Sequence, residues 1–334
     1  MALSTIKTAS IANDAVTTDK IVNDGNLGNK NLIINGAMQV AQRGTSGTST
    51  ADIYTVDRFS LGHGSPVNAM TFEQSTDAPA NFKYSLKITA GTGASAGTTG
   101  YASLRQAIEG QNIAHVNFGT SAAKDITLSF WVKCSLTGNF GTNIRNQAGN
   151  RAYASIYTIN SANTWEYKTV TIPADTGGTW PTDSGIGFHM QWDLGAGSNY
   201  DIAAGSWTDG TNMFGVEGTV KLTETTNATW QMTGVQVEIG DVATPFEHED
   251  IGATLRKCKR YYEMIDTTIF QTNYSSNGLG NFAWTEQKRA TPTLSADTNP
   301  DMTLHAETTS GGYVYKGSGF TGNAVRGLRG ASEL

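Results

Sequence analysis

The sequence predicts an all-β chain built around a two-sheet sandwich of the jelly-roll kind, with one short helix and a small C-terminal β region. Three observations predict this fold class. Hydrophobic residues are 38% and charged residues 16% of the 334 residues, and Thr, Ser, Gly and Asn fill the gap, which suits strands and tight turns. Apolar residues alternate in many short runs bounded by Gly, Asn, Asp or Pro. Long helical periodicity is nearly absent.

Residues 1–30 differ from the rest because their aliphatic residues recur every five positions. These residues are Ile6, Ile11, Val16 and Ile21. A period of five matches neither a helix nor a strand, and one chain alone cannot bury so few apolar groups. Several copies wound around one axis can bury them, since each copy supplies one apolar residue per layer. We therefore predict an attachment and trimer-threading segment; a disordered tail is the alternative.

The strand signals are densest over residues 31–248, which we assign to the jelly-roll domain. Side chains on one face of each predicted strand are apolar in YSLKITA (84–90), TLSFWVKC (127–134), FHMQWD (188–193) and VEGTVKL (216–222). In WQMTGVQVEIG (230–240) the apolar phase shifts after Met232. A β-bulge at Gly234 would absorb the extra residue. Many short strands without intervening helices predict the sandwich.

A connecting helix is predicted over residues 249–265, and a small β domain over 266–334. Asp250 is suited to cap the helix. The apolar positions step by three and four along one helix face: Ile251, Leu255, Cys258, Tyr262 and Ile265. The C-terminal region is too small to bury a large core alone, so we expect it to pack on its own copies or on the sandwich.

Charge and hydropathy exclude several classes of partner. The net charge is −6 and no Lys/Arg cluster runs five residues, so nucleic acid is not an expected partner. No apolar run reaches the roughly 20 residues that a membrane-spanning helix needs. The start of the chain also lacks the apolar core of a signal peptide, so we expect folding in the cytoplasm that makes the protein. Cys134 and Cys258 match no metal spacing and are expected to be free thiols.

Several sequence blocks, in this order and spacing, resemble a widespread class of phage tail-fibre and virion structural proteins. The blocks are NLIINGAMQVAQRG with YTVDRF, SLRQAIEG, TLSFWVKCSLTGNF, WEYKTVTIP, TGVQVEIGDVATPFEHEDIGATLRKCKRYYE, KRATPT and the closing ASEL. Together they span most of residues 31–334. SIANDAVTTDKI, near the start, also resembles the repeats that precede such domains in phage fibres.

The resemblance implies a homotrimeric virion protein with a jelly roll similar to carbohydrate-binding modules, and it implies no activity. We therefore expect a tail fibre, exposed on the particle, that docks to other virion proteins through its N-terminal segment and binds a host-surface glycan. Two alternatives stay open. The first is a capsid- or tail-decorating protein without a receptor role. The second is a polysaccharide-degrading enzyme.

The candidate sugar site lies in the glycine-rich stretch 177–212. Sugar recognition uses flat aromatic faces with Asp or Asn side chains that bond hydroxyls. The candidates are Trp180, Trp207, Tyr200, Asp183 and Asp209. Trp180 and Trp207 sit in turns, where an aromatic residue has less reason to be core. The alternative is that they cover sheet edges or pack against a neighbouring subunit.

Catalytic and metal signals are weak. No pair of carboxylates shows a recognised acid–base spacing, because Glu247, Glu249 and Asp250 directly precede the helix. The turns with Asp175, Asp183 and Asp209 favour Asx turns. No cofactor is expected, although Asn35 and Glu238 would offer two oxygen ligands to calcium if their strands pair. Calcium takes six to eight.

Overall fold

The structure is a computed structural model that describes residues 30–265, 272–274, 277–296, 303–306, 308–316 and 328–334. The four aliphatic residues of the predicted threading segment, Ile6, Ile11, Val16 and Ile21, lie outside the described residues. The trimer-threading role of that segment stays a prediction.

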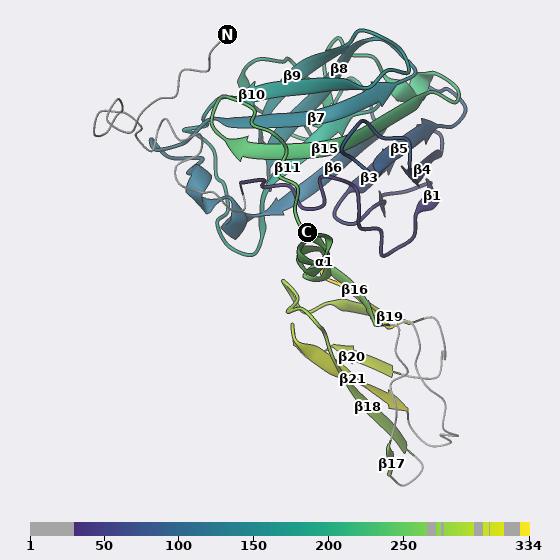
Figure 1. The fold of residues 1–334 in the computed structure, drawn as a ribbon. Helices are drawn as coiled ribbons and strands as arrows, with labels where there is room; N and C mark the ends of the chain where they lie inside the picture. Colours follow the sequence, from purple (N-terminus) through teal and green to yellow (C-terminus); the bar gives the residue numbers. More distant parts are fainter. Residues whose placement is uncertain (1–29, 266–271, 275–276, 297–302, 307, 317–327) are drawn as a thin grey trace, which may run out of the picture.

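The sandwich consists of two antiparallel sheets that face each other (Figure 1). The six-stranded sheet has the order β1 (Ser46–Ser49), β4 (Met70–Ser75), β5 (Ser85–Ala90), β15 (Thr229–Ile239), β7 (Ile126–Cys134) and β10 (Glu166–Ile172). The seven-stranded sheet has the order β13 (Trp207–Asp209), β9 (Arg151–Ile159), β8 (Gly138–Asn146), β11 (Ile186–Asp193), β6 (Tyr101–Glu109), β3 (Ser60–Gly64) and β2 (Ile53–Tyr54).

Apolar side chains from the two inner faces form one core. In β7, Leu128, Phe130 and Val132 are fully buried, and in β11 so are Phe188 and Trp192. Because strand side chains alternate between faces, the residues between them point away from the core. The predicted period-two runs in these strands are therefore confirmed, as is the all-β sandwich fold class.

The β-bulge predicted at Gly234 is also confirmed. The pairing of β15 with β7 shifts register between Thr233 and Gln236. Gly234 has a φ of +64°, and a Cβ there would lie 2.6 Å from the Phe82 ring. Only glycine fits both the left-handed backbone and this close contact.

The strand predicted over 216–222 is wrong. Only Gly215 and Val216 form a strand (β14), which pairs in parallel with β12 (Asp201–Ile202). Gly218, with a φ of +71°, then turns the chain away, and a 3-10 turn spans Leu222–Glu224. The buried Asp193 carboxylate fixes this loop, because it accepts hydrogen bonds from Val216 N and from Lys221 Nζ. Two further 3-10 turns cover Gly110–Asn112 and Ala114–Val116.

The helix is shorter than the sequence predicts. It spans Ile251–Lys259 (α1), and Asp250 caps it as predicted by accepting hydrogen bonds from Gly252 N and Ala253 N. The next residues, Tyr262–Ile265, form strand β16 and not a last helical turn. Pairing with β22 (Leu328–Ala331) accounts for this, because the backbone N–H and C=O groups of Tyr262–Ile265 find their hydrogen-bond partners in that strand.

The small C-terminal region therefore begins at Tyr262 and contains two sheets. One has the order β16, β22 and β19 (Thr293–Ser295). The other has the order β17 (Thr272–Tyr274), β18 (Asn277–Ala283), β21 (Gly311–Lys316) and β20 (Thr303–Ala306). Trp284, Val314 and Leu328 form its small core.

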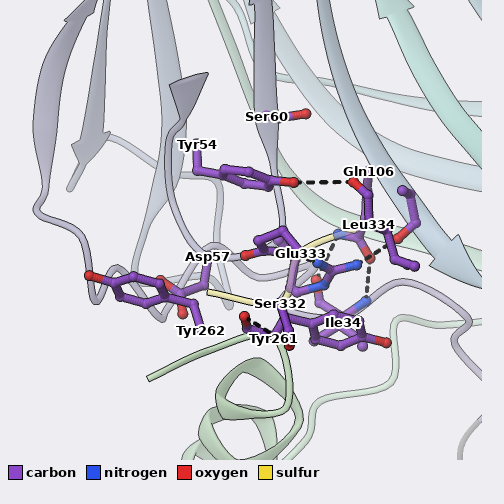
Figure 2. Close-up of polar contacts among 12 residues, drawn as sticks. Ile34, Tyr54, Asp57, Ser60, Gln106, Tyr261, Tyr262, Ser332, Glu333 and Leu334 are labelled. Atoms are coloured by element: carbon purple, nitrogen blue, oxygen red, sulfur yellow. Dashed lines mark hydrogen bonds and ion pairs between the residues drawn. The ribbon is translucent and has the colours of Figure 1, made fainter. Parts of the chain in front are cut away.

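After β22 the chain returns to the sandwich, and Figure 2 shows this junction. Ser332 N donates to Tyr261 O at 2.7 Å. The Glu333 carboxylate forms ion pairs with Arg43 and with the buried Arg58. The segment that contains ASEL thus closes the C-terminal region against the sandwich, beside α1 (Figure 1).

Candidate functional site

Trp180 and Trp207 pack together in an aromatic cluster with Phe118. The ring centroids of the two tryptophans are 5.6 Å apart, and that of Trp180 lies 5.1 Å from Phe118. Trp180 is only 7% exposed and belongs to the core, so its predicted place outside the core is wrong. Its indole N–H donates to Asp175 Oδ2 at 3.0 Å and to Gly177 O at 3.1 Å.

Buried Asp175 explains why this loop folds inward. Arg151 pairs with Asp175 at 2.6 Å and with exposed Asp209 at 3.2 Å. The Trp207 indole, half-buried, donates to Pro173 O at 3.0 Å. A buried carboxylate is stable where it is paired and hydrogen-bonded, as Asp175 is. The cluster is therefore held by its own polar contacts.

The other predicted sugar-site residues lie apart from this cluster. Asp183 accepts a hydrogen bond from Gly185 N, which is the Asx turn that its sequence context favours. Tyr200 instead contacts Tyr101 and Phe214, at centroid distances of 6.0 and 5.1 Å. The structure therefore brings together Trp180, Trp207 and Asp209, but neither Asp183 nor Tyr200 joins their contacts. Whether any of the five binds sugar stays a prediction.

Asn35 and Glu238 do not fit a calcium site. Asn35 Oδ1 already accepts hydrogen bonds from Gln39 N and Val40 N. The Glu238 carboxylate accepts from Thr244 N, Thr244 Oγ1 and Gln236 Nε2. The side-chain oxygens of Asn35 and Glu238 therefore already accept hydrogen bonds within the protein, each from a separate set of donors. Within the described ranges, no three His, Cys, Asp or Glu side chains lie together as a metal site would need.

A second constellation lies on the face of the seven-stranded sheet that points away from the core, here called the outer face. Strand pairing places its side chains in rows. One row runs Ala107, His189, Arg145 and Ala152, and the next runs Ser60, Arg105, Gln191, Asn143 and Ala154. Arg105, Arg145, His189 and Gln191 are therefore neighbours contributed by three adjacent strands.

The outer face concentrates polar atoms without partners. Ten buried side-chain nitrogen and oxygen atoms lack a hydrogen-bond partner among the described residues, and four of them lie here. The four are Ser103 Oγ, Arg145 Nε, His189 Nδ1 and Gln191 Oε1. Buried polar atoms are ordinarily paired, so a cluster of unpaired ones calls for a water, an ion or a ligand to complete it.

Charge on this face is only partly balanced. Arg105 donates to Asp52 Oδ2 at 2.8 Å and to Ser60 Oγ at 3.2 Å. Arg145 forms no ion pair among the described residues and lies 5.0 Å from the centroid of the Phe214 ring. Burial, followed by repulsion from Arg105, lowers the pKa of Arg145 to about 10. Burial and the two arginines also hold the pKa of His189 well below its usual value, so its imidazole is neutral at pH 7.

Aromatic rings and the C-terminal segment flank the polar rows. Tyr101, Tyr200 and Phe214 form a half-buried group, with the rings of Tyr101 and Phe214 stacked at 5.3 Å. A pocket with about 90 Å³ of free space is lined by Arg105, His189 and Leu334, among others. Figure 2 shows Leu334 beside Tyr54 and Gln106, and Tyr54 Oη donates to Leu334 O at 3.3 Å.

The sequence gives little signal for this face. Arg105, Arg145, His189 and Gln191 are single polar residues in strands, and their convergence depends on which strands pair. The one available signal is alternation: His189 and Gln191 stand between Phe188, Met190 and Trp192, which the period-two pattern assigns to the core. Alternation predicts a solvent-side position but no neighbours.

No protein-family model matches this chain, and a search of curated proteins also finds no match. Among solved structures, the chain is similar to the enzymatically active domain of tailspike protein 4 of bacteriophage CBA120, with 14% identity and a TM-score of 0.34 over 63% of this chain and 22% of that one. It thus spans under a quarter of that domain. It is also similar to a family 11 carbohydrate-binding module from Clostridium thermocellum in complex with a mixed-linked tetrasaccharide, with 13% identity and a TM-score of 0.29 over 61% of this chain and 98% of that one.

None of the helices in the described parts of the chain is long and apolar enough to cross a membrane.

Proposed function

We propose that this chain is a fibre protein of a bacteriophage particle and that the outer face of its sandwich binds a host-surface glycan without catalysis. The sequence blocks that resemble phage fibre proteins support the placement in a virion. Homotrimeric assembly, which the same resemblance implies, would raise a weak single-site affinity through avidity.

One observation carries the binding role. The outer face combines half-buried aromatic rings with buried polar atoms that have no partner among the residues the structure describes. Sugars need both elements, because aromatic faces contact C–H groups while polar side chains bond hydroxyls. The Trp180 cluster lacks this combination, since its indole N–H groups and Asp175 already bond within the protein.

The test is binding of the full chain to a panel of bacterial surface polysaccharides. Tyr200→Ala and Phe214→Ala should each weaken binding about tenfold, because an aromatic contact is lost. Tyr167→Ala is the matched control: Tyr167 is 43% exposed and packs on Trp131 of the other sheet. Thermal melting of each variant separates lost binding from lost folding.

The outcomes separate the alternatives. Binding without release of reducing ends supports the proposal, and release of reducing ends would establish the enzyme alternative instead. Absence of binding to every polysaccharide would leave the decorating role ahead. If Tyr167→Ala weakens binding as much as Tyr200→Ala and Phe214→Ala do, the binding site is not on the outer face.

A further inference from the structure

We propose that the outer face selects glycan units that carry a carboxylate, held between the guanidinium groups of Arg105 and Arg145. This inference rests on the proposed glycan-binding function and specifies its ligand.

The first step is the charge balance of the face. The strands contribute two permanent cations, Arg105 and Arg145, and the neutral imidazole of His189. Asp52 pairs with Arg105, whereas Asp193 is engaged by Lys221 at 2.6 Å. Asp201 also pairs with Lys221, at 2.8 Å. The positive charge of Arg145 is therefore left without a carboxylate among the described residues.

The second step is desolvation. Arg145 Nε and His189 Nδ1 are buried without hydrogen-bond partners in the described part of the chain, and an unpaired buried charge is costly. The lowered pKa of Arg145 reflects that cost. A carboxylate accepts hydrogen bonds from a guanidinium group in a planar, charge-assisted geometry. It thus supplies both the missing charge and the missing acceptor.

The third step distinguishes a sugar acid from other anions. Gln191 Oε1 is an acceptor that no donor of the described residues reaches, while Gln191 Nε2 donates to Asn143 Oδ1 at 2.7 Å. A sugar hydroxyl can donate to this oxygen, whereas a sulfate or a phosphodiester group has no proton to donate at neutral pH. The adjoining rings of Tyr101 and Phe214 suit sugar C–H groups. A polyanion such as nucleic acid is disfavoured by the net charge of −6.

The experiment compares paired ligands that differ only in charge. Glycans containing glucuronic, galacturonic or sialic acid are tested beside the same glycans after reduction of each carboxyl to an alcohol. The full chain should bind at least one acidic glycan about tenfold more tightly than its reduced partner. Arg145→Gln should remove this difference, so that the acidic glycan binds no more tightly than its reduced partner. Arg256→Gln, an equal charge change on the exposed face of α1, is the control.

Each outcome decides the proposal. Equal binding of acidic and reduced glycans overturns carboxylate selection but leaves glycan binding intact. Binding to no glycan overturns the proposed function as well. If Arg145→Gln and Arg256→Gln weaken binding of the acidic glycan equally, the effect is one of overall charge, and the proposed carboxylate site is wrong. Inorganic phosphate that competes as well as the acidic glycan shows a simple anion site and overturns the sugar-acid ligand.

Discussion

At the scale of single residues, two arginines differ in how the cost of burying their guanidinium charge is offset. Arg58 is 2% exposed, stacks on the Tyr261 ring at 3.5 Å and donates to Ala107 O at 2.6 Å. Glu333 completes its contacts with an ion pair. Arg145 has no such carboxylate among the described residues. Removing one partner of a buried ion pair is strongly destabilising, so the Arg58–Glu333 pair bears on folding, whereas the unpaired charge of Arg145 is the observation behind the proposed ligand.

Glu333→Ala should lower the free energy of unfolding by about 3 kcal/mol, because it leaves Arg58 buried without its carboxylate. Urea unfolding measures the change. Glu224→Ala, at an exposed carboxylate that forms no ion pair with any described residue, should cost less than about 0.5 kcal/mol. Similar losses in both variants would contradict the structural role of the Glu333 pair.

Trp180→Ala should cost roughly 3 kcal/mol or more of unfolding free energy, because it leaves a cavity in the core. Trp165→Ala, at a half-buried loop position, should cost less than about 1 kcal/mol. Thermal or chemical melting of both variants provides the comparison. If Trp180→Ala melts like the unchanged protein but binds no glycan, Trp180 returns as a sugar-stacking residue.

The two cysteines should resist alkylation in the folded protein. Both are buried and free. Burial raises the pKa of the Cys134 thiol to about 11 and that of Cys258 well above its usual value, so neither is a reactive thiolate at pH 8. Mass spectrometry after iodoacetamide treatment at pH 8 should find both unmodified, and both modified once the chain is unfolded without reductant. A disulfide-linked peptide pair would contradict the free-thiol assignment.

At the scale of elements, the connection from β9 to β10 depends on one carboxylate. Glu166 accepts hydrogen bonds from Asn160 N, Ser161 N and Lys168 Nζ. Burial alone would raise the pKa of Glu166, but these hydrogen bonds outweigh it and lower the pKa to about 2. The carboxylate therefore stabilises the fold fully above its ordinary pKa near 4.5, and this contribution is lost as the pH falls through about 2.

Glu166→Gln should consequently reduce stability by about 1–2 kcal/mol at pH 7, and the difference from the unchanged protein should shrink by more than half by pH 3. Urea unfolding at pH 7 and pH 3 checks this. Glu73→Gln is the comparison, because the exposed Glu73 lies 3.9 Å from Lys87 and should contribute almost nothing at either pH. If the loss of unfolding free energy in Glu166→Gln is the same at both pH values, the ionised carboxylate does not stabilise this connection.

The elements that sequence predicts best are those with a strong local pattern. The alternation in β7 and β11, the bulge at Gly234 and the Asp250 cap each depend on neighbouring residues alone. The end of α1 and the 216–222 segment depend on distant partners, namely β22 and Asp193. Periodicity within a segment carries no information about those partners, so both predictions fail where pairing or a buried carboxylate overrides it.

At the scale of the whole molecule, the candidate site shows the same limit. The sequence directs attention to tryptophans in glycine-rich turns, and one of these, Trp180, folds into the core because Asp175 and Arg151 draw its loop inward. The outer face instead assembles from β6, β8 and β11, which are far apart in the chain and adjacent only in the sheet. Tyr200 is the one predicted residue that lies beside it.

The full chain should sediment as a homotrimer at micromolar concentration, because the aliphatic period in residues 1–30 needs several copies for burial. A truncated chain that begins at Asn31 should keep the sandwich fold, as judged by circular dichroism and melting, but lose docking to the particle. A stable monomer of the full chain would contradict the threading role. Docking by the truncated chain would place the attachment surface elsewhere.

The return of the chain from β22 to the sandwich has a mechanical consequence. A domain that hangs on one peptide connection swings freely about it. The C-terminal region is instead fastened at both of its ends, through α1 on leaving and through the Glu333 ion pairs with Arg43 and Arg58 on returning. A pull on its tip is therefore shared by two load paths, and a twist applied there reaches the sandwich as torque. In the proposed fibre, such a joint would transmit force to the sandwich where a single tether would only pivot.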